Sequence, residues 1–278
     1  MKKLNVFVAC HKPVDVYRND VFIPIHVGRS VSRYQNEMGD MIGDDTGDNI
    51  SEKNHMYCEM TAQYWAWKNI HDVEYIGFCH YRRFFDMKLS DENVDSLFHD
   101  HDVVLVMKRN VDIVIKTLPQ YILLEDMTIF LMVLKKLHPE YEKLTLDYLY
   151  GNKKYICNML ICRKELFDQY AEWLFGILRE CEKYMKELPY SRARRALAYL
   201  SEDFMALFFM YHHYRIKKVR IKGLNSGICF RIKDAIKAAE YYILKPFIKM
   251  KKPRSFEHLY DPAVLVGLKN DGIIPIGD

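Results

Sequence analysis

Residues 75–85 of the chain run Tyr75-Ile76-Gly77-Phe78-Cys79-His80-Tyr81-Arg82-Arg83-Phe84-Phe85. The first five are almost all apolar or aromatic, a pattern that predicts a buried β-strand. Turn residues are expected at the end of a strand, but here a histidine, a tyrosine and two adjacent arginines follow. Guanidinium groups present planar forks of donors that fit phosphate oxygens, and ligands of open α/β sheets bind beyond the carboxyl ends of strands. The stretch therefore predicts a site for a phosphorylated ligand.

Strands and helices alternate along the chain, which is typical of an α/β fold with a mainly parallel sheet. The expected strands are Leu4–Cys10, Tyr75–His80, Asp102–Met107, Tyr155–Cys162 and Arg215–Ile221. The expected helices are Tyr57–Ile70, Asp126–Leu137, Glu140–Tyr148, Lys164–Glu187, Glu202–His213 and Arg231–Lys245. No linker divides the first 220 residues, so we expect a single Rossmann-like domain over residues 1–222 and a helical, basic extension over residues 223–278.

Cysteine usage and hydropathy indicate the compartment. The seven cysteines are odd in number and form no Cys-x-x-Cys pair, which argues against a zinc ribbon or a disulfide framework and for a reducing environment. The apolar run after Met1-Lys2-Lys3 is short and reaches His11 at once, so we expect a first strand there rather than a signal peptide. No apolar stretch approaches the length of a transmembrane helix.

Positive charge is concentrated near the C-terminus. Residues 192–254 hold sixteen Lys and Arg against four Asp and Glu, a balance of +12 in a chain whose net charge is +4. Within this stretch Ile232, Ile236, Ala239 and Ile243 recur at helical spacing among basic residues, which predicts an amphipathic basic helix ending near Pro246. We expect it to lie on an anionic membrane surface; ordinary packing on the domain is the alternative. No nucleic-acid-binding module is recognisable, so we expect no nucleic-acid partner.

A second dense segment lies upstream of the arginines. Asp44-Asp45-Thr46-Gly47-Asp48-Asn49 is a turn-forming cluster. Residues 52–69 contain no Gly or Pro and predict a helix, with Ser51 or Asn54 as its N-cap. Two tryptophans and a glutamate so close to an acidic turn are more than a core helix requires.

These two segments resemble the signature of a bacterial family of capsular and exopolysaccharide glycosyltransferases, long catalogued as a domain of unknown function. The shared motifs are Asp45-x-Gly47-Asp48-Asn49, the helix up to Asn69, His80-Tyr81-Arg82-Arg83, residues 24–28 and residues 200–204. The resemblance spans about Asn5 to Ile221. It implies a nucleotide-sugar-dependent transferase with a single GT-A-like domain. Some members are linked to galactofuranose transfer, so UDP is the nucleotide implied, with a lipid-linked or saccharide acceptor and a cytoplasmic, peripheral position on the inner face of the plasma membrane.

The resemblance and the placement at strand ends together nominate the donor-binding residues. They are His11, Gly28, Asp45, Asp48, Asn49, Thr61, Trp65, Lys68, His80, Arg82, Arg83 and Asn158. Inverting transfer needs a carboxylate to deprotonate the acceptor hydroxyl, and in this fold class the base commonly comes from the later half of the chain. Glu202 and Asp203 fit that place as catalytic residues, with Glu202 preferred, although acids at a helix start have a structural explanation as well.

The metal requirement is open. Single-domain glycosyltransferases usually hold a metal on an Asp-x-Asp motif after a mid-chain strand, where this chain has His80-Tyr81-Arg82-Arg83. Either the two arginines neutralise the diphosphate, which we favour, or Mg²⁺ or Mn²⁺ binds Asp45 and Asp48. Two other classes of function are alternatives: a metal-dependent phosphoryl-transfer enzyme or hydrolase built on Asp44, Asp45 and Asp48, and a nucleic-acid-binding protein using residues 192–254.

Overall fold

The computed structural model describes residues 3–110, 112–185, 192–222, 239–244 and 251–272, together with Ile232 and Ile236. The chain forms two compact units, each built from separate stretches of sequence. Unit 1 comprises Met1–Met107, Tyr155–Trp173 and Phe208–Ser226, and unit 2 comprises Lys108–Lys154, Leu174–Leu207 and Gly227–Asp278. The predicted domain boundary at residues 222/223 lies at the edge of a stretch outside the described residues and stays a prediction.

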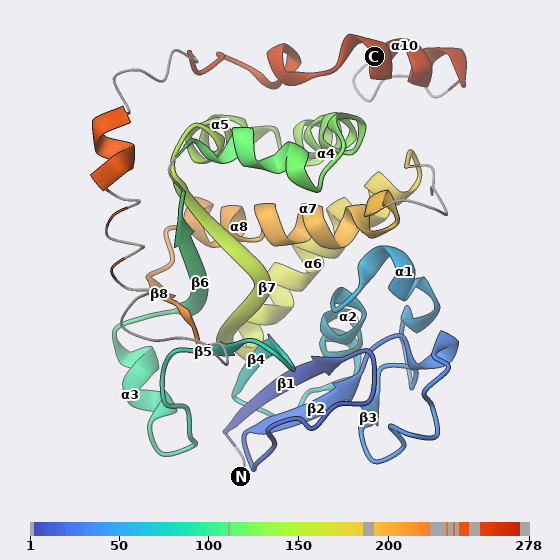
Figure 1. Ribbon diagram of the computed structural model, residues 1–278, viewed down its shortest axis with the longest axis vertical. Coiled ribbons are helices and arrows are strands. Elements are labelled where there is room, and N and C mark those ends of the chain that lie inside the picture. Colours follow the sequence, from blue (N-terminus) through green and yellow to red (C-terminus); the bar gives the residue numbers. More distant parts are fainter. Residues whose placement is uncertain are drawn as a thin grey trace. The chain divides into compact units, whose positions relative to one another are not determined.

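A seven-stranded sheet with the strand order β3-β2-β1-β4-β7-β6-β8 forms the centre of unit 1 (Figure 1). The strands are β1 Leu4–Cys10, β2 Phe22–His26, β3 Ile42–Gly43, β4 Tyr75–His80, β6 Val103–Arg109, β7 Lys153–Arg163 and β8 Ile216–Val219. β1 runs parallel to both β2 and β4, β2 to β3, and β6 to β8, whereas β7 is antiparallel to β4. A separate antiparallel pair joins β5 Phe84–Phe85 to β9 Ile221–Lys222. The predicted α/β fold with a mainly parallel sheet is confirmed.

α-Helices, 3₁₀ helices and loops make up the rest of the described chain. The α-helices are α1 Asn54–Tyr57, α2 Met60–Asn69, α3 Val94–His99, α4 Leu124–Leu137, α5 Glu142–Leu149, α6 Lys164–Glu182, α7 Ala196–Phe204, α8 Ala206–Tyr211 and α10 Pro262–Asn270. The 3₁₀ turns are η1 Arg29–Val31, η2 Ser51–Lys53, η3 Val114–Gln120, η4 Pro139–Tyr141, η5 Arg192–Arg195 and η7 Phe256–Leu259. Within the described residues, none of the helices is both long and apolar enough to span a bilayer.

Aromatic side chains hold helices on one face of the unit 1 sheet. Phe7 of β1 and Phe78 of β4 are direct partners in the parallel ladder, and their rings stack at 5.8 Å. Phe7 also meets Trp65 of α2 edge-on at 5.9 Å, and Phe78 meets Phe167 of α6 at 5.0 Å. Because successive side chains of a strand point to opposite faces, odd-numbered residues of β1 pack on one face of the sheet and even-numbered residues on the other.

The opposite face carries the next residues of the same strands. Tyr75 of β4 stacks on Phe98 of α3 at 4.8 Å, and Val8 and Cys79 lie in the same buried cluster. That cluster also takes in Phe85 of β5 and other residues of the loops that cover this face. The sheet of unit 1 is therefore buried on both faces, which leaves its carboxyl edge as the place where strand ends meet solvent and ligand.

The helix predicted over Tyr57–Ile70 is interrupted. α1 ends at Tyr57, and α2 starts at Met60, because Cys58 between them has a φ of +47°. The Cys58 carbonyl accepts a hydrogen bond from the side chain of Asn54 at 2.7 Å, and the Thr61 hydroxyl oxygen lies 2.9 Å from it. These polar groups satisfy the break locally, and nothing in the apolar periodicity signals it.

The helix predicted over Glu202–His213 begins earlier. α7 starts at Ala196, so Glu202 and Asp203 lie in its last turn and not at a helix start. The structural explanation that placed these acids at a helix N-terminus is therefore wrong. The run Ala196-Leu197-Ala198 has strong helix propensity, and it starts the helix one and a half turns before the acids.

The predicted basic helix over Arg231–Lys245 falls mostly outside the described residues. The described part is helical at Ile232, Ile236 and residues 239–244. The side chains of Ile232, Ile236 and Ile243 are 55%, 51% and 67% exposed. The apolar stripe that the spacing predicts is thus exposed at these three positions.

Candidate active site

The strand order places a topological switch at β1. The chain runs from β1 outward to β2 and β3 and then returns to pair β4 on the other side of β1, so the carboxyl ends of β1 and β4 face the crevice in which open α/β sheets bind ligands. His11 directly follows β1, and His80 is the last residue of β4. The rings of His11 and Tyr81 lie 5.5 Å apart, so the two strand ends are in contact.

A tight turn at the end of β4 separates the two arginines. The backbone groups of His80 and Arg83 bond to each other in both directions, at 3.3 and 3.0 Å, with Tyr81 and Arg82 at the tip. We call this turn, residues 80–83, the arginine hairpin. Arg83 donates to the sulfur of Cys157 at 3.4 Å, whereas the Arg82 guanidinium lies 4.9 Å from the centre of the Tyr81 ring. Both arginines are exposed, but their side chains contact different residues, Cys157 for Arg83 and Tyr81 for Arg82.

His80 is fixed by the backbone of β7. Its Nε2 lies 2.7 Å from the carbonyl oxygen of Cys157. A carbonyl oxygen only accepts hydrogen bonds, so Nε2 must carry the proton, and the ring orientation is set by this bond. The same nitrogen lies 4.0 Å from the Glu59 carboxylate, and the two side chains are 20% and 19% exposed. Histidine and glutamate therefore face each other at the carboxyl edge while both stay accessible.

Glu59 is held in place from β7. Asn158 donates from its side-chain nitrogen to Glu59 Oε1 at 2.8 Å, and Gln63 of α2 donates to the Asn158 carbonyl at 2.9 Å. Backbone strain gathers at this contact, because Cys58, Cys157 and Asn158 all have positive φ values, of +47°, +74° and +47°. Non-glycine residues held in this region cost about 1–3 kcal/mol each, and such strain clusters at functional sites. We call Glu59, His80, Arg83 and Asn158 the Glu59 cluster.

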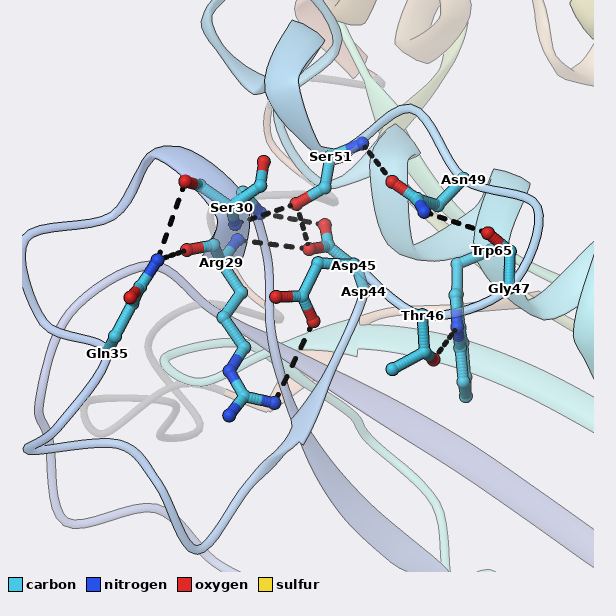
Figure 2. Close-up of polar contacts among 11 residues, drawn as sticks. Arg29, Ser30, Gln35, Asp44, Asp45, Thr46, Gly47, Asn49, Ser51 and Trp65 are labelled. Carbon is cyan, nitrogen blue, oxygen red and sulfur yellow. Dashed lines mark hydrogen bonds and ion pairs between the residues drawn. The ribbon is translucent and has the colours of Figure 1, made fainter.

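Asp44 forms a second, fully buried centre (Figure 2). Its carboxylate accepts from the backbone N–H groups of Gly28 and Arg29, at 2.7 and 3.0 Å. It also accepts from the hydroxyl groups of Ser51 and Thr61, at 2.5 Å each. Four donors satisfy the charge, which accounts for an ionised group with no exposure to solvent. Asp44 thus ties the end of β2, the loop after β3 and the start of α2 together.

Gly28 is required by the same arrangement. Its φ is +65°, and a Cβ atom there would lie 2.5 Å from the Asn54 side chain. A side chain at this position would be strained and would displace Asn54, so glycine is the residue that fits. His26, two residues earlier, is completely buried, and burial lowers its pKa, so its ring stays uncharged beside Asp44 at neutral pH.

The Asp45–Asn49 loop is fastened along α2. Figure 2 shows the indole of Trp65, which donates to the Thr46 hydroxyl at 2.9 Å. The Tyr64 hydroxyl donates to Asp48 at 3.1 Å, and the Asp45 carboxylate pairs with Arg29 at 3.7 Å. Asn49 Oδ1 accepts from the backbone N–H of Ser51 at 3.1 Å. Lys68 lies in the last turn of α2, with its ammonium 3.4 Å from the centre of the Trp67 ring.

These bonds bear on the metal that the fold class implies. Both oxygens of Asp44 accept protein donors, and one oxygen of Asp48 accepts from Tyr64, so the loop offers a divalent cation the Asp45 carboxylate and the second oxygen of Asp48. Among the described His, Cys, Asp and Glu side chains, no group of three could hold a metal ion. With Asp44 filled by protein donors and Asp45 paired with Arg29, the loop does not fit an Asp-x-Asp type of site. We therefore derive no step through a metal.

Asp203 lies in unit 2 and is bound to a lysine. Its carboxylate pairs with Lys154 Nζ at 2.6 Å and accepts from the Tyr121 hydroxyl at 3.1 Å, and its side chain has no exposure. Burial raises the pKa of Asp203 to about 7, against the opposite effect of Lys154. Glu202 is half-buried in the same helix turn. The catalytic roles predicted for both stay predictions.

Of the predicted donor residues, the described contacts bring His11, His80, Arg83 and Asn158 to the β1/β4 edge and the Glu59 cluster. Thr61 and Gly28 belong to the Asp44 centre, and Asn54 bonds to Thr61 at 3.2 Å and to the carbonyl of Cys58, the residue before Glu59. The sequence marked a glutamate in this helix as unusual, but Glu59 was not among the predicted site residues. Its only signal was an acid within an aromatic helix, because its partner Asn158 is 99 residues away. The donor-binding roles stay predictions.

Comparison with known proteins places the chain in a family. The model of a family described as a domain of unknown function, DUF4422, matches residues 5–213. A solved structure, the apo form of the WbbM bifunctional glycosyltransferase, is similar, with 26% sequence identity and a TM-score of 0.69. The match covers 81% of this chain and 46% of that chain, so the present chain corresponds to less than half of WbbM. No curated protein matches significantly.

Proposed function

Because this chain belongs to the DUF4422 family and its fold is similar to that of a bifunctional glycosyltransferase, we propose that it transfers a sugar from a nucleoside diphosphate to an acceptor hydroxyl. One observation carries the proposal. At the switch-point edge of the sheet, an exposed arginine, a histidine and an accessible glutamate lie beside the strained backbone of Cys58, Cys157 and Asn158. That combination suits a reaction with an anionic leaving group and a proton to remove.

The arginine hairpin supplies the positive charge. As the bond between the anomeric carbon and the diphosphate breaks, negative charge develops on the leaving oxygen. A guanidinium at the carboxyl edge stabilises that charge through bonds that strengthen in the transition state. Arg83 is the better placed of the two arginines, because the Cys157 sulfur orients it beside His80. His80 donates a hydrogen bond from Nε2 to the Cys157 carbonyl, which fixes the end of β4 against β7.

We assign the base to Glu59. In an inverting transfer the acceptor oxygen attacks the anomeric carbon while its proton passes to a carboxylate and the diphosphate leaves with the bonding electrons. Asn158 orients the Glu59 carboxylate, and the Glu59 side chain is 19% exposed, so a ligand can reach it. Of the two bases expected from the sequence, Asp203 is buried against Lys154, and Glu202, the preferred one, is the remaining rival. Glu59 lies on the same edge as the hairpin, 4.0 Å from His80 Nε2.

The finer assignments rest on the family resemblance. UDP as the nucleotide, a hexose such as galactofuranose as the donor sugar, and a lipid-linked or saccharide acceptor in capsular or exopolysaccharide synthesis are all part of the proposal. So is a peripheral position on the inner leaflet, for which the exposed stripe of Ile232, Ile236 and Ile243 gives support. The phosphoryl-transfer alternative loses support because protein donors occupy both oxygens of Asp44 and one oxygen of Asp48.

Replacing Glu59 with Gln tests the assignment. The amide keeps the shape and the Asn158 contact region but cannot take a proton. We expect release of UDP from UDP-sugar donors to slow by about a hundredfold or more while the donor Kd changes less than about twofold. Glu52→Gln, at an exposed position of η2, is the matched control.

Two outcomes would contradict this assignment. In one, Glu59→Gln turns over as fast as Glu52→Gln. In the other, Glu202→Gln abolishes turnover at unchanged donor affinity, which would return the base to the residue expected from the sequence.

A further inference from the structure

A cavity of about 710 Å³ opens on the far side of the arginine hairpin. Its volume lies within the range of about 300–1,000 Å³ that is usual for small-molecule sites. Tyr81 and Arg82 from the hairpin tip line one end of it, and Tyr17, Phe22 and Phe84 line the wall. All the lining residues belong to unit 1. None of the assignments above uses this cavity.

The wall of the cavity is aromatic. The rings of Tyr17, Phe22 and Phe84 meet edge to face, at 5.5, 5.7 and 6.1 Å between centroids. Tyr17 is 59% exposed, so its ring lies open to solvent at the cavity wall. Sugar rings carry faces of C–H groups that pack on aromatic rings, whereas their hydroxyl groups point outward to polar neighbours. An aromatic wall open to solvent therefore suits a saccharide.

The rim of the cavity is positively charged. Arg82, Lys88 and Lys222 line it, against a single carboxylate, Asp15. None of the three cations forms an ion pair with a carboxylate among the described residues, although surface lysines and arginines elsewhere in the chain do. Lys222 is held in place because it pairs with Phe84 in the two-stranded sheet. Cations without acidic partners beside an aromatic wall favour a ligand that carries an anionic group.

The position of the cavity separates it from the donor edge. Phe22 is the first residue of β2, and it pairs with Val6 in the middle of β1, so the cavity extends along the sheet toward the amino ends of these strands. The Asp44 centre and Arg83 lie at the carboxyl ends. The hairpin itself connects the two places, because Arg82 faces the cavity and the next residue, Arg83, faces the Glu59 cluster. Consecutive residues of the hairpin, Arg82 and Arg83, therefore join the cavity to the Glu59 cluster.

We propose that this cavity is the acceptor site and that the acceptor is an anionic saccharide, with sugar rings on Tyr17 and Phe84 and a phosphate or carboxylate on Arg82 and Lys88. The inference rests on the proposed function, since it gives the second substrate of that reaction a place. It divides the hairpin, with Arg83 for the donor diphosphate and Arg82 for the acceptor anion. The cavity would bind its ligand without any donor present.

Binding of small probes tests this directly. Galactose 1-phosphate, digalacturonic acid, lactose and inorganic phosphate would each be titrated, by ligand-observed NMR, into wild type, Tyr17→Ala and the double variant Arg82→Ala/Lys88→Ala. Tyr17 and both cations are exposed, so the variants should fold. We expect one of the two anionic sugars to bind at least fivefold more tightly than lactose or phosphate. If that sugar is galactose 1-phosphate, the preferred anion is a phosphate; if it is digalacturonic acid, the preferred anion is a carboxylate. Each variant should weaken binding of that sugar about fivefold or more.

The control and the donor titration keep two failures apart. Lys143→Ala, on the exposed face of α5, should leave the Kd values for the anionic sugar and for UDP unchanged. The Kd for UDP should also be the same in Tyr17→Ala as in wild type. If UDP binds but the variants bind the anionic sugars as wild type does, the acceptor site is wrong and the proposed function stands. If Tyr17→Ala weakens UDP as much as the sugar, the cavity is the donor pocket and the proposal is overturned. If the sugars bind as predicted but UDP does not, the donor assignment fails instead.

Discussion

Replacing Asp44 with Ala should destabilise the protein strongly. The change removes the acceptor of four hydrogen bonds. The hydroxyl groups of Ser51 and Thr61 can rotate toward other acceptors, but the backbone N–H groups of Gly28 and Arg29 cannot. A buried donor left unpaired costs about 1–3 kcal/mol, so two of them cost about 2–6 kcal/mol. This is a large part of the roughly 5–15 kcal/mol that holds a domain folded.

Thermal and urea unfolding measure the loss, with Asp45→Ala as the matched control. The neighbouring Asp45 makes one ion pair with Arg29 at 3.7 Å and is 25% exposed, so its removal should cost at most about 1 kcal/mol. We expect Asp44→Ala to lower the melting temperature by roughly 5–20 °C and Asp45→Ala by far less. Equal melting temperatures in the two variants would refute the structural role of Asp44. A stabilisation of wild type by Mg²⁺ that Asp44→Ala abolishes would make Asp44 a metal ligand instead.

Two further predictions concern pH and the membrane. Burial raises the pKa of Asp126 to about 6, so the stability that its protonated carboxyl contributes is present near pH 4 and is lost as the pH rises through 6. Asp126→Asn should remove this pH dependence and add about 3 kcal/mol to the free energy of unfolding at pH 7.5. An unchanged pH profile of urea unfolding in the variant would contradict this prediction. The protein should co-sediment with anionic but not with neutral liposomes, and less so at high salt. The double variant Ile236→Glu/Ile243→Glu should stay in solution, because it places charge on the exposed stripe. Equal sedimentation of wild type and variant would show that the stripe does not contact lipid.

Local patterns predicted the elements that are continuous in sequence. The apolar runs of β1, β4 and β7 and the long helix α6 were recognisable, because each buries a side-chain set with a simple period. β2 was missed, since Pro24 argues against a strand. The structure tolerates this proline because β3 pairs only with Ile25 and His26, so no strand opposes Pro24 on that side.

The site was predictable only where the sequence itself carries the chemistry. The two arginines after β4 were visible because charged residues rarely follow a buried strand. Glu59 was not, since its role depends on Asn158 and on the left-handed backbone at Cys157 and Cys58. Asp44 looked like one of several turn acids, and only its four donors distinguish it from Asp45. Long-range hydrogen bonds and backbone strain of this kind have no local pattern.

The Arg83 side chain bears on the central claim most directly. Calorimetric titration of the protein with UDP, and with GDP and ADP for comparison, should be made with and without Mg²⁺. The matched control is Arg163→Ala, an exposed arginine on β7 that lies opposite Tyr75 at the start of β4, far along the strand from the hairpin. The account predicts that wild type and Arg163→Ala bind a nucleoside diphosphate alike, and that Arg83→Ala binds it about 10- to 100-fold more weakly, as expected for loss of a charge-assisted hydrogen bond. Absence of nucleotide binding in wild type, or equal affinity in Arg83→Ala, would contradict it.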